Sequence, residues 1–268
     1  MRTPGHRVSV VLPTYNRAAT LMRALDSVLH QSVPVHEVVV VDDGSTDGTA
    51  ELMSAVTRLD PRVRYLWQPN SGATVARNTG LDAVSGDVVA FQDSDDEWIP
   101  TLVERLLPAV GANTVAFGSH RHWTSGRSRV IPPKHVARPR RTLRRTNCFP
   151  THTALLDASL LRETRFDPGL RRFQDWDLWL SLIERTDARM IHVPVVVVEK
   201  HMLPDSIGSG SAAVRDASLR RILRRHWRLF ATDPLALGRT AARAFVRPAR
   251  DRLTAGGASL RRARKATP

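Results

Sequence analysis

The chain has 268 residues, with 40 lysines and arginines against 26 aspartates and glutamates, and a single cysteine. Hydrophobic residues make up 42% of it, enough to bury a sizeable core, so the composition excludes an intrinsically disordered protein. A lone thiol, Cys148, excludes an intramolecular disulfide and a zinc ribbon, and is best explained as a small buried apolar residue. Neither a signal-peptide pattern nor an apolar run of membrane-spanning length is found, so we expect a cytoplasmic protein.

The net charge of +14 is unevenly distributed. Residues 1–214 contain 25 basic and 23 acidic side chains, a net +2, whereas residues 215–268 contain 15 and 3, a net +12. A sequence pI near 11.4 is typical of nucleic-acid-binding proteins. Only three basic residues are lysines, however, and genomic base composition can produce such an arginine excess without a functional demand. The charge alone therefore does not identify a partner.

Four short, β-branched apolar runs alternate with three amphipathic segments in the first hundred residues. The expected strands are residues 8–12, 37–41, 62–67 and 87–91, and the expected helices are residues 18–29, 49–59 and 73–84. This alternation predicts an α/β fold with a mostly parallel sheet and helices on both faces. Ligands of such folds bind at the carboxyl ends of the strands.

The pattern is looser in the second part of the chain. The expected elements there are a helix over 102–110, a strand over 114–117, a strand leading into a helix over 153–161, a Trp-rich helix over 175–183 and a strand over 190–198. Residues 125–147 are polar and rich in arginine and proline, which favours a long surface excursion. From residue 213 onward the composition favours helix.

Polar clusters follow three of the predicted strands, at Pro13–Arg17, Asp42–Ser45 and Gln92–Asp96. Each alone is typical of loops and helix caps, but three at the same edge of a sheet favour a ligand-binding crevice. The last cluster has three carboxylates in four positions, which raise one another's pKa unless a cation neutralises them. Mg²⁺ or Mn²⁺ is suited to this, because both accept a few carboxylates and leave positions for phosphate oxygens. A solvated loop that caps the next helix is the alternative.

These blocks, in this order, resemble the family 2 glycosyltransferases of the GT-A fold. The resemblance is carried by Val10–Arg17, Val40–Asp47, Gly72 with Ala76–Gly80, Asp93–Trp98 and Gln174–Trp179, and it covers about residues 7–209. It implies a Rossmann-like domain with a C-terminal α-helical extension. Residues 1–110 would then form the nucleotide-sugar-binding half, residues 111–212 the half that binds the acceptor and carries the catalytic base, and residues 213–268 a basic helical extension.

The resemblance also implies residue roles. The nucleotide pocket would contain Pro13, Thr14, Tyr15, Asn16, Arg17, Asp42, Arg77, Asp93 and Ser94. Asp42 would hold the edge of the base, and Arg77 would approach the base or the phosphates. Asp93 would lie near the ribose and the metal ion, and Asp95 would be the main ligand of the Asp-x-Asp motif.

Further along the chain, Asp175 matches the general base, and Gln174 stands where the family usually has glutamate. His201, followed by Ser206 and Ser209, resembles a segment that contacts the metal ion or the diphosphate. Asp175 is also a good residue to cap the helix that follows it, and the two roles are compatible. His120 and His152 have no role in the resemblance, so we expect them to be ordinary satisfied polar residues.

Together these roles predict an inverting glycosyltransferase that moves one sugar from a nucleotide-diphosphate sugar, with UDP favoured, to an acceptor hydroxyl. The cation would act as a Lewis acid on the diphosphate, and Asp175 would accept the proton of the incoming hydroxyl. No Gln-x-x-Arg-Trp motif of the processive synthases is present, which favours one transfer per encounter. The sequence does not identify the acceptor, and a saccharide, a lipid-linked molecule and a small molecule all stay open.

The basic tail carries one predicted amphipathic helical stripe. Its apolar members are Leu219, Ile222, Leu223, His226, Trp227 and Phe230. This helix is expected to dock on the catalytic domain with its arginines in solvent, or alternatively to lie on an anionic membrane near a lipid-linked acceptor. Two other functions stay open: a catalytically silent nucleotide-sugar-binding scaffold, and a nucleic-acid binder that uses the tail.

Overall fold

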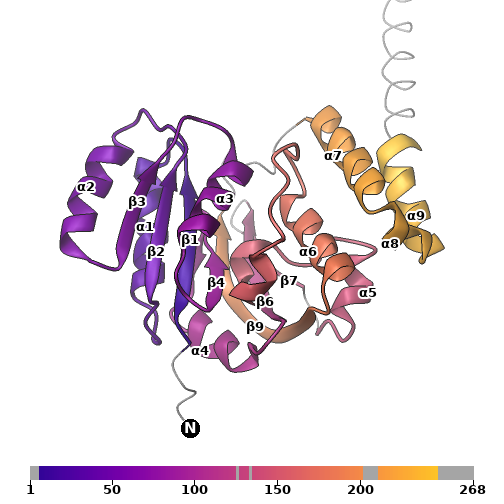
Figure 1. Ribbon diagram of the computed structural model, residues 1–268, viewed down its shortest axis with the longest axis horizontal. Helices are drawn as coiled ribbons and strands as arrows, with labels where there is room; N and C mark the ends of the chain where they lie inside the picture. Colours follow the sequence, from indigo (N-terminus) through magenta and orange to yellow (C-terminus); the bar gives the residue numbers. More distant parts are fainter. Residues whose placement is uncertain (1–5, 125–126, 133–134, 202–210, 247–268) are drawn as a thin grey trace, which may run out of the picture.

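The structure is a computed structural model that describes residues 6–124, 127–132, 135–201 and 211–246 (Figure 1). Its strands are β1 (Val8–Thr14), β2 (Glu37–Asp42), β3 (Val63–Trp67), β4 (Val88–Phe91), β5 (Glu97–Trp98), β6 (Thr114–Thr124), β7 (Arg127–Ile131), β8 (Ala154–Asp157) and β9 (Arg189–His201). Its helices are α1 (Ala18–Leu29), α2 (Thr49–Leu59), α3 (Ala73–Ala83), α4 (Leu102–Leu106), α5 (Pro139–Leu143), α6 (Gln174–Arg185), α7 (Ala212–Arg225), α8 (Trp227–Ala231) and α9 (Pro234–Ala241).

The strands form one nine-stranded mixed sheet in the order β3-β2-β1-β4-β8-β6-β9-β5, with β7 paired to β6. The first four strands are all parallel, as predicted, with Val10 opposite Val38 and Val8 opposite Val88. The antiparallel strand β8 then joins this half to β6. The α/β fold with a largely parallel amino-terminal half is therefore confirmed.

Both faces of the sheet are covered, which explains why its strands are continuous apolar runs. Val10 and Leu12 of β1 pack on one side in a cluster that includes Leu21 of α1. Val11, which points the other way, belongs to the cluster on the opposite side, with Leu81 of α3. Helix α3 lies so close to the sheet that a Cβ atom at Gly80 would clash with Val11. The carboxyl ends of β1, β2 and β4 are thereby held at one edge.

The described part of residues 125–147 lies mostly at the surface, as expected, but it contains regular structure that was not predicted. Strand β6 extends to Thr124 rather than ending at Phe117, and it forms a hairpin with β7, in which His120 lies opposite Ile131. Helix α5 follows within the same polar stretch. Pairing of β6 with β7 and β9 supplies the backbone hydrogen bonds that the polar composition did not reveal.

The C-terminal helices dock on the second half of the sheet, as Figure 1 shows. Leu219, Ile222 and Phe230 are buried in the same cluster as the apolar residues of α6. The single predicted stripe is wrong at Trp227, which is 60% exposed, because α7 ends at Arg225 and the chain turns before α8 begins. None of the helices in the described ranges has the length and apolar character needed to cross a membrane.

Two of the tail's arginines, although exposed as expected, also pair with a buried carboxylate. Arg221 and Arg225 form ion pairs with Asp167, with N–O distances of 2.6 and 3.1 Å. His226 lies between Asp177 and Glu184 of α6, at 2.9 and 2.5 Å. These contacts fix the orientation of α7 on α6.

Candidate active site

The loops after β1 and β2 are tied together by Asn16. This residue adopts a left-handed conformation with a φ of 50°. Its backbone N–H donates to the Ser45 hydroxyl at 2.9 Å, and its side-chain oxygen accepts from the Thr46 N–H at 2.8 Å. Beside it, the buried Thr14 hydroxyl has no hydrogen-bond partner among the described residues, and Tyr15 is 47% exposed. The first two predicted clusters are therefore joined by hydrogen bonds at the carboxyl ends of β1 and β2.

Asp42, at the end of β2, is fully buried. Its carboxylate accepts hydrogen bonds from the Ser45 N–H at 2.8 Å and from the Tyr65 hydroxyl at 2.7 Å. Burial and the nearby Asp42 carboxylate raise the pKa of Tyr65, so this hydroxyl remains a donor. The structure thus holds Asp42 in one orientation at the carboxyl end of β2.

The neighbouring Asp43 has a different function, because it fixes the start of α3. It accepts from the backbone N–H groups of Ser71 and Gly72 at 2.8 and 2.7 Å and from the Gln68 amide at 2.7 Å. Gly72 precedes α3 with a φ of 93°, a conformation that favours glycine. Asp43 thereby helps to set the position of Arg77 one turn into that helix.

Arg77 joins the two halves of the site. Its buried guanidinium donates to Asp93 at 2.8 Å and to the Gln174 side-chain oxygen at 2.7 Å, and it lies 5.5 Å from the centre of the Phe166 ring. Gln174 is the first residue of α6, and its amide nitrogen also donates to the Leu170 carbonyl at 3.0 Å. A glutamine here accepts the arginine hydrogen bond and keeps both of its own polar atoms satisfied.

The third predicted cluster contacts His152 and Lys200, which come from distant parts of the chain. The Nδ1 atom of His152 is 2.8 Å from Asp93 and 3.5 Å from Asp96. Lys200 donates to Asp96 at 2.7 Å. Asp93, Asp96 and His152 offer ligand atoms that all lie within 4.8 Å of one another. Carboxylate and imidazole groups at this spacing are suited to a divalent ion such as Mn²⁺.

The acidic residues of this loop have opposite pKa shifts. Burial alone would raise the pKa of Asp93, but the hydrogen bond with His152 and the charge of Arg77 hold it well below its ordinary value. The pKa of Asp95 is raised, first by burial and then by the charges of Asp93 and Asp96. Binding of a cation would stabilise the charged form of Asp95. Ser94, between them, is buried.

Asp175 lies in the first turn of α6, one residue inside the helix rather than at its cap. Its carboxylate accepts from the Trp176 N–H at 2.9 Å and from the Asn147 amide at 2.8 Å. Burial raises the pKa of Asp175, although both hydrogen bonds oppose that rise. The result is a fixed carboxylate that is more basic than an ordinary aspartate, which is what a proton acceptor requires.

Three contributors were missed by the sequence analysis: His152, Lys200 and Asn147. The expectation that His152 is a fully satisfied polar residue was wrong, because its buried Nε2 atom has no partner among the described residues. Nothing in the spacing of these residues indicates their position, since each reaches the site through tertiary pairing. Of the predicted His201 segment, the side chain of His201 and all of Ser206 and Ser209 lie outside the described residues.

Comparison with known proteins decides the family. The model of glycosyl transferase family 2 matches residues 9–166, more than half of the chain. The chain is a family 2 glycosyltransferase. Among curated members, the UDP-Glc:alpha-D-GlcNAc-diphosphoundecaprenol beta-1,3-glucosyltransferase WfgD of Escherichia coli is 30% identical over 236 residues, which cover 85% of this chain and 88% of WfgD. Several other relatives are longer proteins, of which the match covers only 15 to 31%.

Solved structures share the fold of this glycosyltransferase. TarS of S. aureus in complex with UDP-GlcNAc has a TM-score of 0.65 at 21% identity, over 90% of this chain and 73% of TarS. The mannosyltransferase PcManGT of Pyrobaculum calidifontis, in complex with GDP-Man and Mn²⁺, has a TM-score of 0.64 at 22% identity, over 95% of this chain and 80% of PcManGT. These similarities establish the GT-A fold.

Proposed function

We propose that this glycosyltransferase moves a single sugar from a UDP-sugar to an acceptor hydroxyl, with inversion at the anomeric carbon and with Asp175 as the general base. The observation that carries the proposal is the chain of contacts from Asp93 through Arg77 to Gln174, which is followed directly by Asp175. It places a basic carboxylate at a fixed position relative to the carboxylates that would hold the donor's cation.

The donor would occupy the crevice at the ends of β1, β2 and β4. Thr14, Asn16 and Asp42 offer polar atoms for the nucleoside, and Arg77 offers a buried positive charge for the phosphates. TarS, a structural neighbour, binds UDP and UDP-GlcNAc, which favours uracil as the base. The neighbour that binds GDP-Man makes a GDP-sugar the first competitor to test.

A divalent cation fits the acidic loop. We propose Asp93 and Asp95 as its carboxylate ligands, with Asp96 and His152 beside them, because the pKa of Asp95 is raised first by burial and then by like charges that a cation would balance. The Mn²⁺ ion in the PcManGT complex supports this assignment. When bound, the ion would supply Lewis-acid stabilisation of the departing diphosphate. Lys200 also donates a hydrogen bond to Asp96 at 2.7 Å.

Asp175 would accept the proton of the attacking hydroxyl. The two hydrogen bonds that it accepts hold the carboxylate still, and its raised pKa increases its strength as a base. A base that acts in the same step as departure of the diphosphate gives a single displacement, and a single displacement inverts the anomeric centre. General-base assistance of this kind contributes roughly a hundred- to ten-thousand-fold in rate.

The acceptor, we propose, is a lipid-linked saccharide. WfgD, which matches over most of both chains, acts on a diphosphoundecaprenol-linked GlcNAc. An enzyme with such an acceptor works at a membrane surface, and a location at the cytoplasmic face of the membrane follows. The basic C-terminal helices would supply the peripheral contact.

A donor panel tests the proposed function. The protein is incubated with Mn²⁺ and a set of UDP-, GDP- and dTDP-sugars together with lipid-linked saccharide acceptors, products are identified by mass spectrometry, and the anomeric configuration is read by NMR. We expect one UDP-sugar to be transferred with inversion. Retention of configuration would contradict the assignment of Asp175 as base, and nucleotide binding without turnover on any donor would favour the silent scaffold instead.

A further inference from the structure

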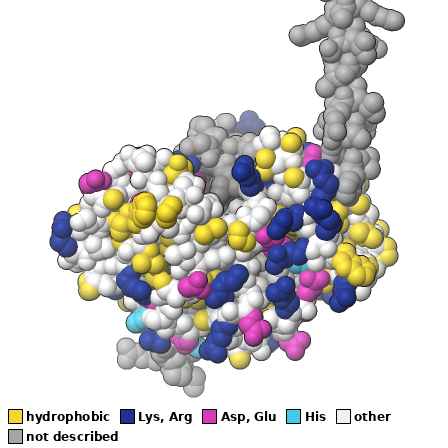
Figure 2. Space-filling view, turned by 45° about the horizontal axis from the view of Figure 1, so that its top comes forward, with side chains coloured by type: hydrophobic (Ala, Val, Ile, Leu, Met, Phe, Trp, Pro, Cys, Tyr) yellow, Lys and Arg dark blue, Asp and Glu magenta, His cyan; other side chains and the backbone are white. Residues whose placement is uncertain are grey.

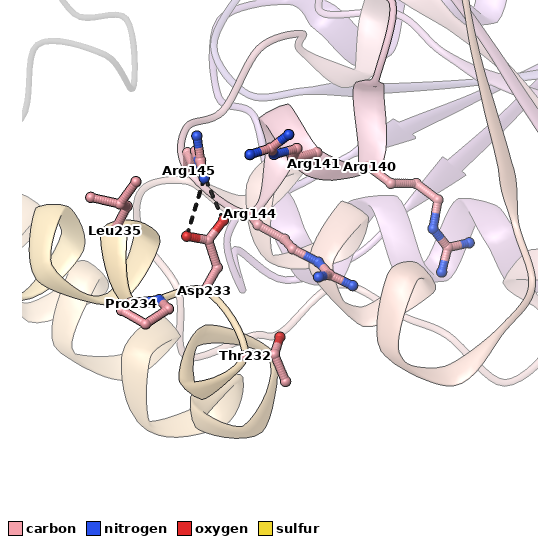
Figure 3. Close-up of a pocket in the computed structure, with 8 residues that line it drawn as sticks. All are labelled: Arg140, Arg141, Arg144, Arg145, Thr232, Asp233, Pro234 and Leu235. Atoms are coloured by element: carbon pink, nitrogen blue, oxygen red, sulfur yellow. Dashed lines mark hydrogen bonds and ion pairs between the residues drawn. The ribbon is translucent and has the colours of Figure 1, made fainter.

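A cationic pocket lies apart from the crevice, between α5 and the start of α9. It has a volume of about 610 Å³ and contains four arginines from α5 and the turn after it, Arg140, Arg141, Arg144 and Arg145. Asp233 and Leu235 line the opposite side (Figure 3). We call this site the arginine pocket. None of the predicted site residues lies in it.

Most of the positive charge in the arginine pocket is unbalanced. Four arginines and one aspartate line it, a formal net charge of +3, although the Arg140 guanidinium points away from Asp233 (Figure 3). Asp233 pairs with Arg145, at 2.9 and 3.3 Å, and Figure 3 shows this pair across the junction. Arg140 donates only to the backbone carbonyls of Ala188 and Ile183, which orient the guanidinium without neutralising it.

Arg144 is the least satisfied of the four. Its Nε atom is buried and has no hydrogen-bond partner, and among the described residues no carboxylate pairs with Arg140, Arg141 or Arg144. An arginine fork matches two oxygens of a phosphate group, and such charge-assisted hydrogen bonds are about twice as strong as neutral ones. The chemistry that completes this pocket is therefore a phosphate or diphosphate group.

Apolar side chains are exposed on the same helices. Leu235, at the rim of the pocket, is 64% exposed, Trp227 is 60% exposed and Leu237 is 40% exposed. In Figure 2 apolar side chains gather at the right-hand edge of the molecule, over α8 and α9, and arginine and lysine side chains lie next to them. Arginines combined with exposed Trp and Leu are typical of protein surfaces at a lipid–water boundary.

The same backbone segment also supports the proposed base. The Leu143 carbonyl accepts from the Trp176 indole at 2.6 Å, and the Asn147 amide donates to Asp175 at 2.8 Å. Arg145 is two residues from Asn147, so their Cα atoms are at most about 7 Å apart. The arginine pocket and the proposed base are thus attached to one short backbone segment.

We propose that the arginine pocket binds the diphosphate of a lipid-linked acceptor, with the lipid against the apolar residues of α8 and α9. The inference rests on the proposed transfer to such an acceptor and adds the site that recognises it. On this proposal the clustered arginines bind one specific ligand and do not merely attract anions in general. A lipid-linked diphosphate and free phosphate would both bind through their phosphate oxygens, and only the first also has a lipid chain.

Calorimetric titration with geranyl diphosphate, a water-soluble prenyl diphosphate, tests the pocket in EDTA and without donor. We expect binding that is weakened about tenfold or more in Arg141→Gln/Arg144→Gln, because each lost charge-assisted hydrogen bond contributes on that scale. Within the described part of the chain neither residue is in a salt bridge, so the variant should fold. Arg58→Gln/Arg105→Gln removes the same charge from α2 and α4 and should bind like the wild type.

Two further arms separate the possible sources of phosphate. Inorganic pyrophosphate should bind more weakly than geranyl diphosphate, and equal affinity would overturn the lipid-linked assignment. Sedimentation with phosphatidylcholine vesicles, with and without phosphatidylglycerol, reports attraction to bilayer headgroups. If Arg141→Gln/Arg144→Gln lost vesicle binding but kept its affinity for geranyl diphosphate, the pocket would be a headgroup site and the proposal would be wrong.

The test is independent of the proposed reaction. Asp175→Asn should bind geranyl diphosphate with the affinity of the wild type, because it alters the proposed base and not the pocket. Binding at the pocket together with absence of sugar transfer on every donor would overturn the proposed function alone. Transfer to a lipid-linked acceptor with no effect of Arg141→Gln/Arg144→Gln on probe binding would overturn the pocket alone.

Discussion

The two halves of the sheet build their parts of the site in different ways. In β1 to β4 each polar cluster follows its own strand, so residues near in sequence are near in space. In the second half, His152 reaches Asp93 across 59 positions and Lys200 reaches Asp96 across 104. The site residues of the first half are neighbours in the sequence, whereas those of the second half are brought together by contacts between distant segments. The polar clusters of the proposed donor site can therefore be predicted from the sequence, whereas the second-half residues that contact them cannot.

The largest expected effect is on the rate of sugar transfer, when the proposed general base in the second half is replaced. Asp175→Asn keeps the shape of the side chain but removes the basic oxygen, so sugar transfer should fall roughly a hundred- to ten-thousand-fold. The affinity for UDP should stay within about twofold of the wild-type value, because the proposed donor site lies in the first half and none of its contacts is changed. Rates come from product formation and affinities from calorimetry. A wild-type rate in Asp175→Asn would show that Asp175 is not the general base, and the second half would then have no assigned catalytic residue.

This division explains what the sequence could predict. The parallel strands, the three polar clusters and Asp175 follow from apolar runs and recognisable motifs. Asn147 and His152 lie in stretches whose local pattern is ordinary, and they gain their roles only when β8 enters between β4 and β6. The helical stripe placed Phe230 correctly in the core and Trp227 incorrectly, because a helix break after Arg225 changes the direction of the side chains that follow.

Stability should distinguish two aromatic residues of that tail. Phe230 is fully buried and meets Trp176 edge-to-face, with ring centres 6.2 Å apart, so Phe230→Ala should lower the free energy of unfolding by roughly 3–5 kcal/mol. Trp227→Ala, three residues earlier, should change it by about 0.5 kcal/mol or less. Urea unfolding followed by circular dichroism measures both. Equal losses would mean that α7 and α8 do not pack on α6 as described.

A smaller, pH-dependent effect is expected in the first half. Burial alone would raise the pKa of Glu37, but hydrogen bonds from Arg64, Ser9 and Ser85 lower it to about 2. Because the folded pKa is lower than the unfolded one, this stabilisation is complete above the ordinary glutamate pKa and is lost as the pH falls through about 2. Glu37→Gln should cost about 1–3 kcal/mol at pH 7.

Unfolding free energies measured from pH 7 to pH 2 check this expectation. The difference between the wild type and Glu37→Gln should shrink as the pH falls, since protonation removes the charge that the substitution removes. A difference that is constant with pH would show that Glu37 acts through packing. Asp167→Asn is the matching variant in the second half, where the hydrogen bond from Arg221 outweighs burial and lowers the pKa of Asp167.

The most direct test of the account is calorimetric titration of UDP in the presence of Mn²⁺ and then in EDTA. The account predicts binding with Mn²⁺ that weakens about tenfold or more when the ion is removed, since a cation at Asp93 and Asp95 would hold the diphosphate. Asp95→Asn should behave in Mn²⁺ as the wild type does in EDTA. If neither UDP nor any other nucleoside diphosphate binds in the presence of Mn²⁺, the proposed donor site is contradicted.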